Sequence, residues 1–205
     1  MRLTKKQQAV LVGTVLGDAF LQKTGAENAR LRFEHSSKQK EYLFWKMGIF
    51  PRLFQNKPTY IKRTHPKTGR TYSYVRVQSD SSPSLGKWQR VFYPHGKKYI
   101  PENLSEIITE PLAIAVWYMD DGYYYGKDRN SYIYLGRVSK QEAQSAKNAV
   151  VNTCGARARV YDKKTKGFAL FFSVSETKKL HKCIHTYILP EFNYKLLPEF
   201  RKKTM

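Results

Sequence analysis

Apolar residues along this chain follow two spacings, one typical of helices and one typical of strands. The apolar stretches at 9–16 and 112–119 predict helices, because Thr4 and Gln7 form a capping-box pattern before the first and Pro111 suits the first turn of the second. Further helices are predicted at 39–50, 85–92, 141–153 and 176–188. Segments in which apolar and polar residues alternate predict strands at 30–34, 59–64, 70–78, 132–138, 156–162 and 168–174. This mixture indicates an α+β fold.

Three short strings occur twice, in the same order. They are Leu16-Gly17-Asp18-Ala19 with Met119-Asp120-Asp121-Gly122, Ser37-Lys38-Gln39 with Ser139-Lys140-Gln141, and Lys98-Tyr99-Ile100-Pro101-Glu102 with Lys195-Leu196-Leu197-Pro198-Glu199. The second string starts 19 residues after Asp18 and 18 after Asp121, and the third starts 80 and 74 residues after them. Ordered matches at similar spacing predict a duplicated unit of about 95 to 100 residues. We therefore expect two pseudo-symmetric domains, at 1–103 and 104–205.

Alternation in the predicted strands separates an apolar face from a polar one. In the segment 70–78, Val75 and Val77 share the apolar face. The polar faces of the strands supply the predicted nucleic-acid contacts, which are Arg30, Arg32, Lys62, Arg70, Tyr72, Tyr74, Arg76, Gln78, Tyr132, Tyr134, Arg157, Arg159 and Tyr161. Arg and Gln suit the guanine and adenine edges of a DNA major groove, and Lys and Arg neutralise phosphates. For any single strand an ordinary solvated sheet face is the favoured explanation, so the prediction depends on repetition across several strands together with the large positive charge.

The charge of the chain supports a polyanionic partner. Lys and Arg number 37 and Asp and Glu 16, which gives a net charge of +21. A basic tail is excluded, because 41% hydrophobic and 14% aromatic residues are enough for a core. The excess is +15 in residues 1–100 and +6 in 101–205, so we expect more of the salt-sensitive affinity to come from the first half.

The compartment is predicted from what the sequence lacks. No apolar stretch reaches the roughly 18 residues of a membrane span, and no signal-like segment follows the basic start. Cys154 and Cys183 lie 29 residues apart without a CxxC spacing, so we expect reduced thiols rather than a disulfide or a zinc site. These features predict an intracellular protein that is not secreted, in an organelle (mitochondrion or chloroplast) or a prokaryotic cytoplasm.

Two acids end the two apolar helices. A carboxylate is disfavoured at the negative C-terminal end of a helix, so Asp18 and Asp121 indicate that a cation neutralises them. If the helices pack side by side through Gly13 and Gly17, the two carboxylates meet, and an all-oxygen site of this kind suits Mg²⁺. His181 with His185, spaced i and i+4, is a weaker metal candidate for which packing or surface roles are favoured.

These helices carry a family resemblance. Leu11-Val12-Gly13-Thr14-Val15-Leu16-Gly17-Asp18-Ala19 resembles the name-giving motif of the LAGLIDADG homing endonucleases, and Ile114-Ala115-Val116-Trp117-Tyr118-Met119-Asp120-Asp121-Gly122 resembles its second copy. The resemblance covers nearly the whole chain and is strongest to the single-chain, two-motif type encoded by group I introns. It implies a monomer with two LAGLIDADG (ββαβ-type) lobes, antiparallel sheets forming a saddle over double-stranded DNA, and two packed motif helices at the centre.

The resemblance also implies an active site. Asp18 and Asp121 match the metal-binding acids, with the carbonyl oxygen of the preceding residue, Gly17 or Asp120, as a further ligand. Lys98 and Lys195 match the active-site lysines, a pair that the repeats align independently. The implied reaction is a Mg²⁺-dependent double-strand break in a long asymmetric DNA target, leaving 3′ overhangs. Mn²⁺ is expected to substitute for Mg²⁺, and Ca²⁺ to support binding without cleavage.

The second motif departs from the family pattern. Val116 and Asp120 replace small residues at the helix contact, so the second helix cannot pack as the first does, whereas Ala19 in place of the final Gly is a mild change. Asp120 is a rival carboxylate, but Asp121 is preferred because it aligns with Asp18.

Two other functions fit the same basic surfaces. One is an RNA maturase, with intron RNA as partner, and the other is a non-catalytic nucleic-acid-binding relative. Retention of both acids and both lysines favours catalysis. A ribosomal or architectural protein is a distant alternative, because it gives no reason for paired acids at helix ends.

Overall fold

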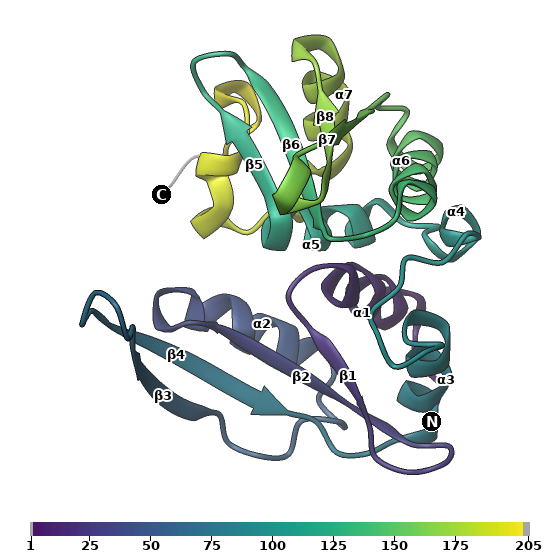
Figure 1. Cartoon of the computed structure of the whole chain (residues 1–205), viewed down its shortest axis with the longest axis vertical. Coiled ribbons are helices and arrows are strands. Elements are labelled where there is room, and N and C mark those ends of the chain that lie inside the picture. Colours follow the sequence, from purple (N-terminus) through teal and green to yellow (C-terminus); the bar gives the residue numbers. More distant parts are fainter. Residues whose placement is uncertain (1, 203–205) are drawn as a thin grey trace. The chain divides into compact units, whose positions relative to one another are not determined.

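The computed structural model describes residues 2–202, which form two compact units (Figure 1). The first unit comprises residues up to 8 and 18–97, and the second comprises 9–17 together with the chain from Lys98 onward. The first helix, α1 (Lys5–Leu16), is therefore shared between the units. The expected division into 1–103 and 104–205 stays a prediction.

The first unit is built on a four-stranded antiparallel sheet. Its strands are β1 (Phe20–Lys23), β2 (Ala29–Ser36), β3 (Thr59–Thr64) and β4 (Thr71–Gln78), in the order β1-β2-β4-β3. Helices α2 (Lys40–Ile49) and α3 (Pro83–Phe92) pack against it. Leu31, Phe33, Val75 and Val77 are buried, while the residues between them are partly exposed, so the predicted alternation is confirmed for β2 and β4.

The second unit repeats this topology. Its strands are β5 (Gly122–Tyr125), β6 (Asn130–Gly136), β7 (Arg159–Asp162) and β8 (Phe168–Phe172), in the order β5-β6-β8-β7. Its helices are α4 (Leu104–Ile107), α5 (Pro111–Asp121), α6 (Lys140–Cys154) and α7 (Val174–Ile184). Three 3₁₀ turns follow, at His185–Tyr187, Pro190–Lys195 and Pro198–Phe200. Two four-stranded antiparallel sheets with helices confirm the predicted α+β class.

The two apolar motif helices meet within the second unit. A Cβ atom on Gly13 would overlap the carbonyl oxygen of Ala113 and lie 2.8 Å from Cβ of Val116. A Cβ atom on Gly17 would lie 2.5 Å from Cβ of Asp120. The glycines of α1 thus make room for Val116 and Asp120 of α5, and the expected unequal packing of the two motifs is confirmed.

Two strands escaped the sequence prediction. β1 begins four residues after the end of α1, and β5 begins immediately after α5. Each has only four residues, and neither FLQK nor GYYY alternates clearly between apolar and polar side chains. Pairing with β2 and β6 makes these segments strands. The helix predicted at 176–188 is also shorter, because the α-helix ends at Ile184 and a 3₁₀ turn continues to Tyr187.

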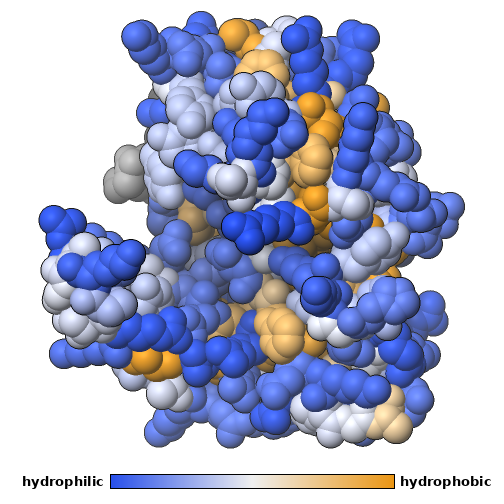
Figure 2. All heavy atoms as spheres, in the orientation of Figure 1, coloured by the Kyte–Doolittle hydropathy of each residue, from blue (hydrophilic) through white to orange (hydrophobic). Residues whose placement is uncertain are grey.

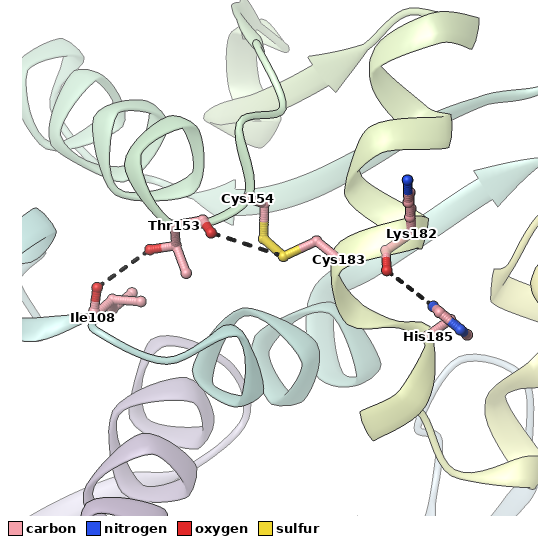
Figure 3. Close-up of a disulfide and its surroundings, with 6 residues drawn as sticks. All are labelled: Ile108, Thr153, Cys154, Lys182, Cys183 and His185. Atoms are coloured by element: carbon pink, nitrogen blue, oxygen red, sulfur yellow. Dashed lines mark hydrogen bonds between the residues drawn. A yellow bond between two sulfur atoms is a disulfide. The ribbon is translucent and has the colours of Figure 1, made fainter.

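The expectation of two reduced thiols was wrong. Cys154, at the end of α6, forms a disulfide with Cys183 in α7 (Figure 3). The two Cα atoms lie 5.5 Å apart, within the range that a disulfide spans. Two cysteines 29 residues apart without a CxxC spacing did not indicate a disulfide, and the packing of α6 against α7 brings them together.

The surface agrees with the charge of the sequence. Hydrophilic side chains dominate the visible face, with smaller apolar patches among them (Figure 2). Among the helices of residues 2–202, none combines the length and the apolar character that crossing a membrane requires.

Removing the disulfide should lower thermal stability. Closing a loop between residues 29 apart contributes about 3 to 4 kcal/mol in the chain-entropy model, which corresponds to a fall of roughly 10 °C in Tm for a chain of this size. We expect this shift in calorimetry of the Cys154→Ser variant and of the reduced wild type. Reduction of the Cys154→Ser variant is the matched control and should change nothing further. Equal Tm values for oxidised and reduced wild type would contradict the prediction.

Candidate active site and nucleic-acid interface

The carbonyl end of α5 is neutralised by a lysine from the end of the chain. Lys195 Nζ donates to the carbonyl oxygens of Met119, at 2.6 Å, and Asp120, at 3.3 Å. The lysine is buried, and its ammonium group sits where the last helical carbonyls lack partners within the helix. A predicted active-site lysine therefore lies at the base of the second motif helix, directly before Asp121.

Lys98 makes the equivalent contact at the end of α1. Its Nζ donates to the carbonyl oxygen of Gly17 at 2.5 Å. In both motifs the lysine thus contacts the carbonyl of the residue that precedes the predicted catalytic acid. Those carbonyls, of Gly17 and Asp120, were the expected additional metal ligands, and here they accept hydrogen bonds from the lysines.

Asp18 lies beside a buried polar pair in the first unit. Its Oδ2 atom is 3.9 Å from Nδ1 of His35, and the Asp18 side chain is about half exposed, at 49%. His35 Nε2 lies 3.2 Å from Nζ of Lys46, which is fully buried near the ring of Tyr42. The His35 ring therefore lies between the amine of Lys46, near Nε2, and the carboxylate of Asp18, near Nδ1.

Sequence reasoning missed His35 and Lys46. Both come to Asp18 through the sheet and α2, which no sequence spacing indicates. The sequence pattern that could have identified His35 is the alternation of buried and exposed residues in β2. The predicted strand ended at residue 34, but the alternation continues and places His35 on the buried face with Leu31 and Phe33.

The two acids at the end of α5 have different surroundings. The Oδ2 atom of Asp120 accepts a hydrogen bond from Oγ1 of Thr14 at 3.4 Å, and its side chain packs against Gly17. Asp120 is therefore part of the helix contact. Asp121 is the last residue of α5, is partly exposed and leads directly into β5.

A buried hydrogen-bond network holds the segment that carries Lys195. His181 Nδ1 accepts from the backbone N–H of Leu197 at 3.0 Å, so the proton of the neutral ring is on Nε2. Nε2 lies 3.0 Å from the Tyr118 hydroxyl and 3.2 Å from Oγ of Ser131. Tyr118 in turn donates to the carbonyl oxygen of Lys195 at 2.8 Å. The network joins α5, β6 and α7 to residues 195–197.

His181 therefore has a packing role, as favoured above, rather than a metal site with His185. His185 Nδ1 lies 3.0 Å from the carbonyl oxygen of Lys182. Burial lowers the pKa of His181 to about 3, so the ring is neutral at physiological pH and can accept the bond from Leu197.

The exposed face of the first sheet gathers most of the predicted contacts of that unit. Cross-strand partners share a face, and the pairs Arg32 with Gln78 and Glu34 with Arg76 place these side chains together, with Arg30 Nη1 donating to Gln78 Oε1 at 3.1 Å. Tyr72 and Tyr74 share this face, while Arg70 precedes β4 and is exposed.

The pairing of β3 with β4 excludes one predicted contact residue from the exposed face of the first sheet. Lys62 pairs with Ser73, on the opposite face, whereas Arg63 pairs with Tyr72. The sequence prediction omitted Arg63 and also Gln22, which pairs with Arg30. The sequence of a short exposed strand such as β3 does not show which side chains lie on which face of the sheet, because five of its six residues are exposed.

The outer face of the second sheet is aromatic. Tyr132 is its centre, with ring centroids of Tyr125 at 5.4 Å, Tyr134 at 6.0 Å and Tyr161 at 6.5 Å. Lys163 Nζ lies 4.5 Å from the Tyr132 ring centroid. The prediction contained Tyr132, Tyr134 and Tyr161 but missed Tyr125 and Lys163, which the tertiary arrangement adds.

The two predicted arginines of this unit lie near its edge. Arg159 is exposed on β7, opposite Phe171. Arg157 precedes β7, and its backbone N–H donates to Oε2 of Glu176 at 2.7 Å. The two faces therefore differ in chemistry, because the first is rich in arginine and amide groups and the second in tyrosine.

The fold and motifs match known proteins. The model of the LAGLIDADG DNA endonuclease family matches residues 8–180. The chain is 30% identical over 223 aligned residues to a protein RecA of Mycobacterium shimoidei, covering 98% of this chain and 49% of that protein. This chain thus spans about half the length of the first relatives of this kind. It is 25% identical to a probable intron-encoded endonuclease 1 of Wickerhamomyces canadensis, covering 95% of this chain and 85% of that protein.

Solved structures show the same fold. The homing endonuclease I-WcaI, bound to its DNA recognition sequence, superposes with a TM-score of 0.87 at 24% identity, covering 96% of this chain and 88% of that one. I-DmoI in complex with DNA and Ca has a TM-score of 0.51 at 15% identity, with 97% of each chain covered.

The buried His181 should make stability depend on pH. Burial lowers its pKa from 6.5, the ordinary value for histidine, to about 3 in the folded chain. Below pH 6.5 the unfolded chain therefore binds a proton that the folded chain does not, and stability falls as the pH drops. Between pH 6.5 and 5 we expect a loss of about 1.6 kcal/mol in the free energy of unfolding, because the slope approaches about 1.4 kcal/mol per pH unit only below the unfolded pKa.

His181→Asn is the test variant, because its amide oxygen can still accept the bond from Leu197. Its unfolding free energy, measured in urea, should be lower at pH 7.5 but flatter between pH 6.5 and 5. The His185→Asn variant, altered at a partly exposed histidine of the same segment, is the control and should keep the wild-type slope. A wild-type slope in His181→Asn would contradict the assignment.

Proposed function

This chain belongs to the LAGLIDADG DNA endonuclease family, and from that premise we propose that it is a site-specific homing endonuclease. In this proposal it makes a metal-dependent double-strand break in a long asymmetric DNA target, leaves 3′ overhangs and acts as a monomer. The observation that carries the proposal is the matched pair of lysine contacts. Lys98 and Lys195 bond to the backbone directly before Asp18 and Asp121, at the ends of the two motif helices.

The available donors fit a hard divalent cation. Asp18 and Asp121 supply carboxylate oxygens at partly exposed positions, and carboxylates with water are the ligands that Mg²⁺ prefers. The Asp120 carboxylate accepts from Thr14 in the helix contact, and we propose Asp121, which aligns with Asp18, as the ligand of the second motif. When bound, Mg²⁺ would supply Lewis-acid activation of the phosphate and water. We propose that Mn²⁺ replaces it and that Ca²⁺ supports binding alone.

The remaining steps belong to the residues of the chain. His35 lies between the Asp18 carboxylate and the buried Lys46, and we propose that it helps to position that carboxylate. Lys98 and Lys195 hold positive charge beside the acids, where they can polarise the attacking water and offset the negative charge that develops on the phosphate and the leaving 3′ oxygen. The His181 network keeps Lys195 in place, since Tyr118 binds its carbonyl oxygen.

We propose that the two exposed sheet faces contact the DNA duplex in different ways. Arg30, Arg32, Arg76 and Gln78 of the first face present the donors that read guanine and adenine edges and neutralise phosphates. Tyrosines of the second face contribute hydroxyl groups and van der Waals area, with little charge.

The aromatic face of the second unit favours one alternative, an RNA maturase. Exposed tyrosines near a lysine suit the stacking of unpaired bases, which RNA loops offer and duplex DNA does not. Failure to cut the intronless target with Mg²⁺ present, together with binding of intron RNA, would favour this function over cleavage.

Removing either proposed metal ligand should abolish cleavage and leave DNA binding. In Asp18→Asn and Asp121→Asn, each measured on a target obtained by cleavage selection from a DNA library, we expect cleavage to fall at least about 100-fold, because the charge that holds the cation is lost. Binding measured with Ca²⁺ should change little. Asp120→Asn is the matched control and should retain most of the activity. Double-strand cutting by both variants would reject the assignment.

The first unit should contribute more of the salt-dependent affinity. Two double variants are compared, each lacking two positive charges. One combines Arg30→Gln and Arg32→Gln in the first unit, and the other combines Arg157→Gln and Arg159→Gln in the second. The slope of log K against log salt should shift by about 0.9 for each lost phosphate contact. We expect the larger shift in the first variant, because its half of the chain carries +15 of the net charge. Equal slopes would contradict this.

A further inference from the structure

A single carboxylate accepts hydrogen bonds from two arginines on the exposed face of the first sheet, and a third, Arg32, lies 3.9 Å from it. Glu34 of β2 accepts from Arg63 of β3 through Nη1, at 2.6 Å, and Nη2, at 3.0 Å. The same carboxylate accepts from Arg76 of β4 through Nε, at 2.6 Å. Three strands are thereby linked by one acid, on a face whose other charged side chains are basic.

The two guanidinium groups are engaged through different edges. Arg63 gives both terminal nitrogens to Glu34, one to each carboxylate oxygen, so its terminal fork is occupied. Arg76 gives Nε and Nη2 to the single oxygen Oε2. A guanidinium group has five N–H donors, so Arg76 keeps its Nη1 hydrogens and the outer Nη2 hydrogen, which together form a second fork.

This second fork matches the bidentate contact by which arginine reads guanine O6 and N7. Arg63 is further held over the ring of Tyr74, with its central carbon 4.9 Å from the centroid. Ion pairs to two arginines, first of all to Arg63, lower the pKa of Glu34, so the carboxylate keeps its charge throughout the neutral range.

We propose that Glu34 is a specificity-determining residue that positions Arg76 to read one guanine, with Arg63 as its support. The inference rests on the proposed DNA-binding function and deepens it. An unpaired arginine is mobile and binds phosphates without regard to sequence. When Glu34 fixes the guanidinium group of Arg76, less conformational entropy is lost on contact with a base, and the direction of that contact is set. The negative charge of Glu34 also weakens the attraction of Arg76 to the phosphate backbone of DNA.

The alternative is an ordinary surface ion pair that links strands and contributes only to stability. Two features of the Glu34 cluster differ from an ordinary surface ion pair. The side chains of Glu34 and Arg76 are only 21% and 25% exposed, and one carboxylate binds both Arg63 and Arg76 at short distances. The specificity profile separates the two explanations, since a stabilising ion pair changes Tm and leaves base discrimination intact.

The experiment compares two variants that lose the same charge. Glu34→Gln removes the shared carboxylate. Glu27→Gln removes the partner of Arg90, an ion pair of 3.0 Å outside the strands, and serves as the matched control. For the full chain, relative binding to the target and to all its single base-pair variants is measured with Ca²⁺ present, and Tm is measured in parallel.

We expect both variants to bind random DNA somewhat more tightly, because each gains one unit of net positive charge. Only Glu34→Gln should lose discrimination, by about tenfold, at one guanine of the target. Arg76→Lys should lose discrimination at the same position, and Arg63→Lys should lose less. The double variant Glu34→Gln with Arg76→Lys should relax that position no further than Arg76→Lys alone.

Two outcomes would overturn the inference. If wild type discriminates among sequences and Glu34→Gln keeps the profile of Glu27→Gln, Glu34 is a structural residue and the proposed function stands. If wild type shows no preferred sequence in binding or cleavage, the proposed function fails and the inference fails with it.

Discussion

The close approach of α1 to α5 is the contact on which the second unit and its candidate site depend. Gly13 allows the backbone of Ala113 and the side chain of Val116 to reach α1, and Gly17 does the same for Asp120. Any larger side chain at these positions would push the helices apart. Because the contact is made with glycines on one helix only, the two motifs pack unequally although they descend from the same pattern of sequence. The Asp120 side chain packs against Gly17 in this contact, and Asp121 follows it as the last residue of α5.

Negative charge gathers at the C-terminal ends of α1 and α5, and Lys98 and Lys195 offset it. Helix C-termini carry partial negative charge, and each motif adds a carboxylate there: Asp121 is the last residue of α5, and Asp18 lies two residues after the end of α1. Lys98 donates to the carbonyl oxygen of Gly17 and Lys195 to those of Met119 and Asp120, so each lysine offsets partial negative charge at the end of one motif helix. Lys195 is held in turn by the network of Tyr118, Ser131 and His181, whose directionality depends on a neutral histidine. The buried polar groups of the second unit thus support its proposed chemistry as well as its stability.

The exposed sheet faces show how one topology can carry two kinds of contact. Both sheets have the same strand order, and in both the alternating residues that leave the core form an outer face. In the first unit this face holds arginines organised by Glu34, and in the second it holds tyrosines around Tyr132. The uneven distribution of charge between the halves of the chain therefore has a structural counterpart.

Much of this protein could be predicted from sequence, because the relevant signals are local. The α+β class, the motif helices, six of the eight strands and the buried faces of β2 and β4 follow from periodicity, and the pairing of Lys98 with Lys195 follows from the repeats.

Tertiary structure decided what depends on distant segments. Strands β1 and β5 are too short to show a period and exist because β2 and β6 pair with them. The register of β3 put Arg63 rather than Lys62 on the sheet face that carries Arg76. Packing of the helices joined Cys154 to Cys183, and α2 brought Lys46 to His35, which lies beside Asp18. Periodicity reports which side of an element is buried, whereas only the folded chain determines which residues from other elements meet it there.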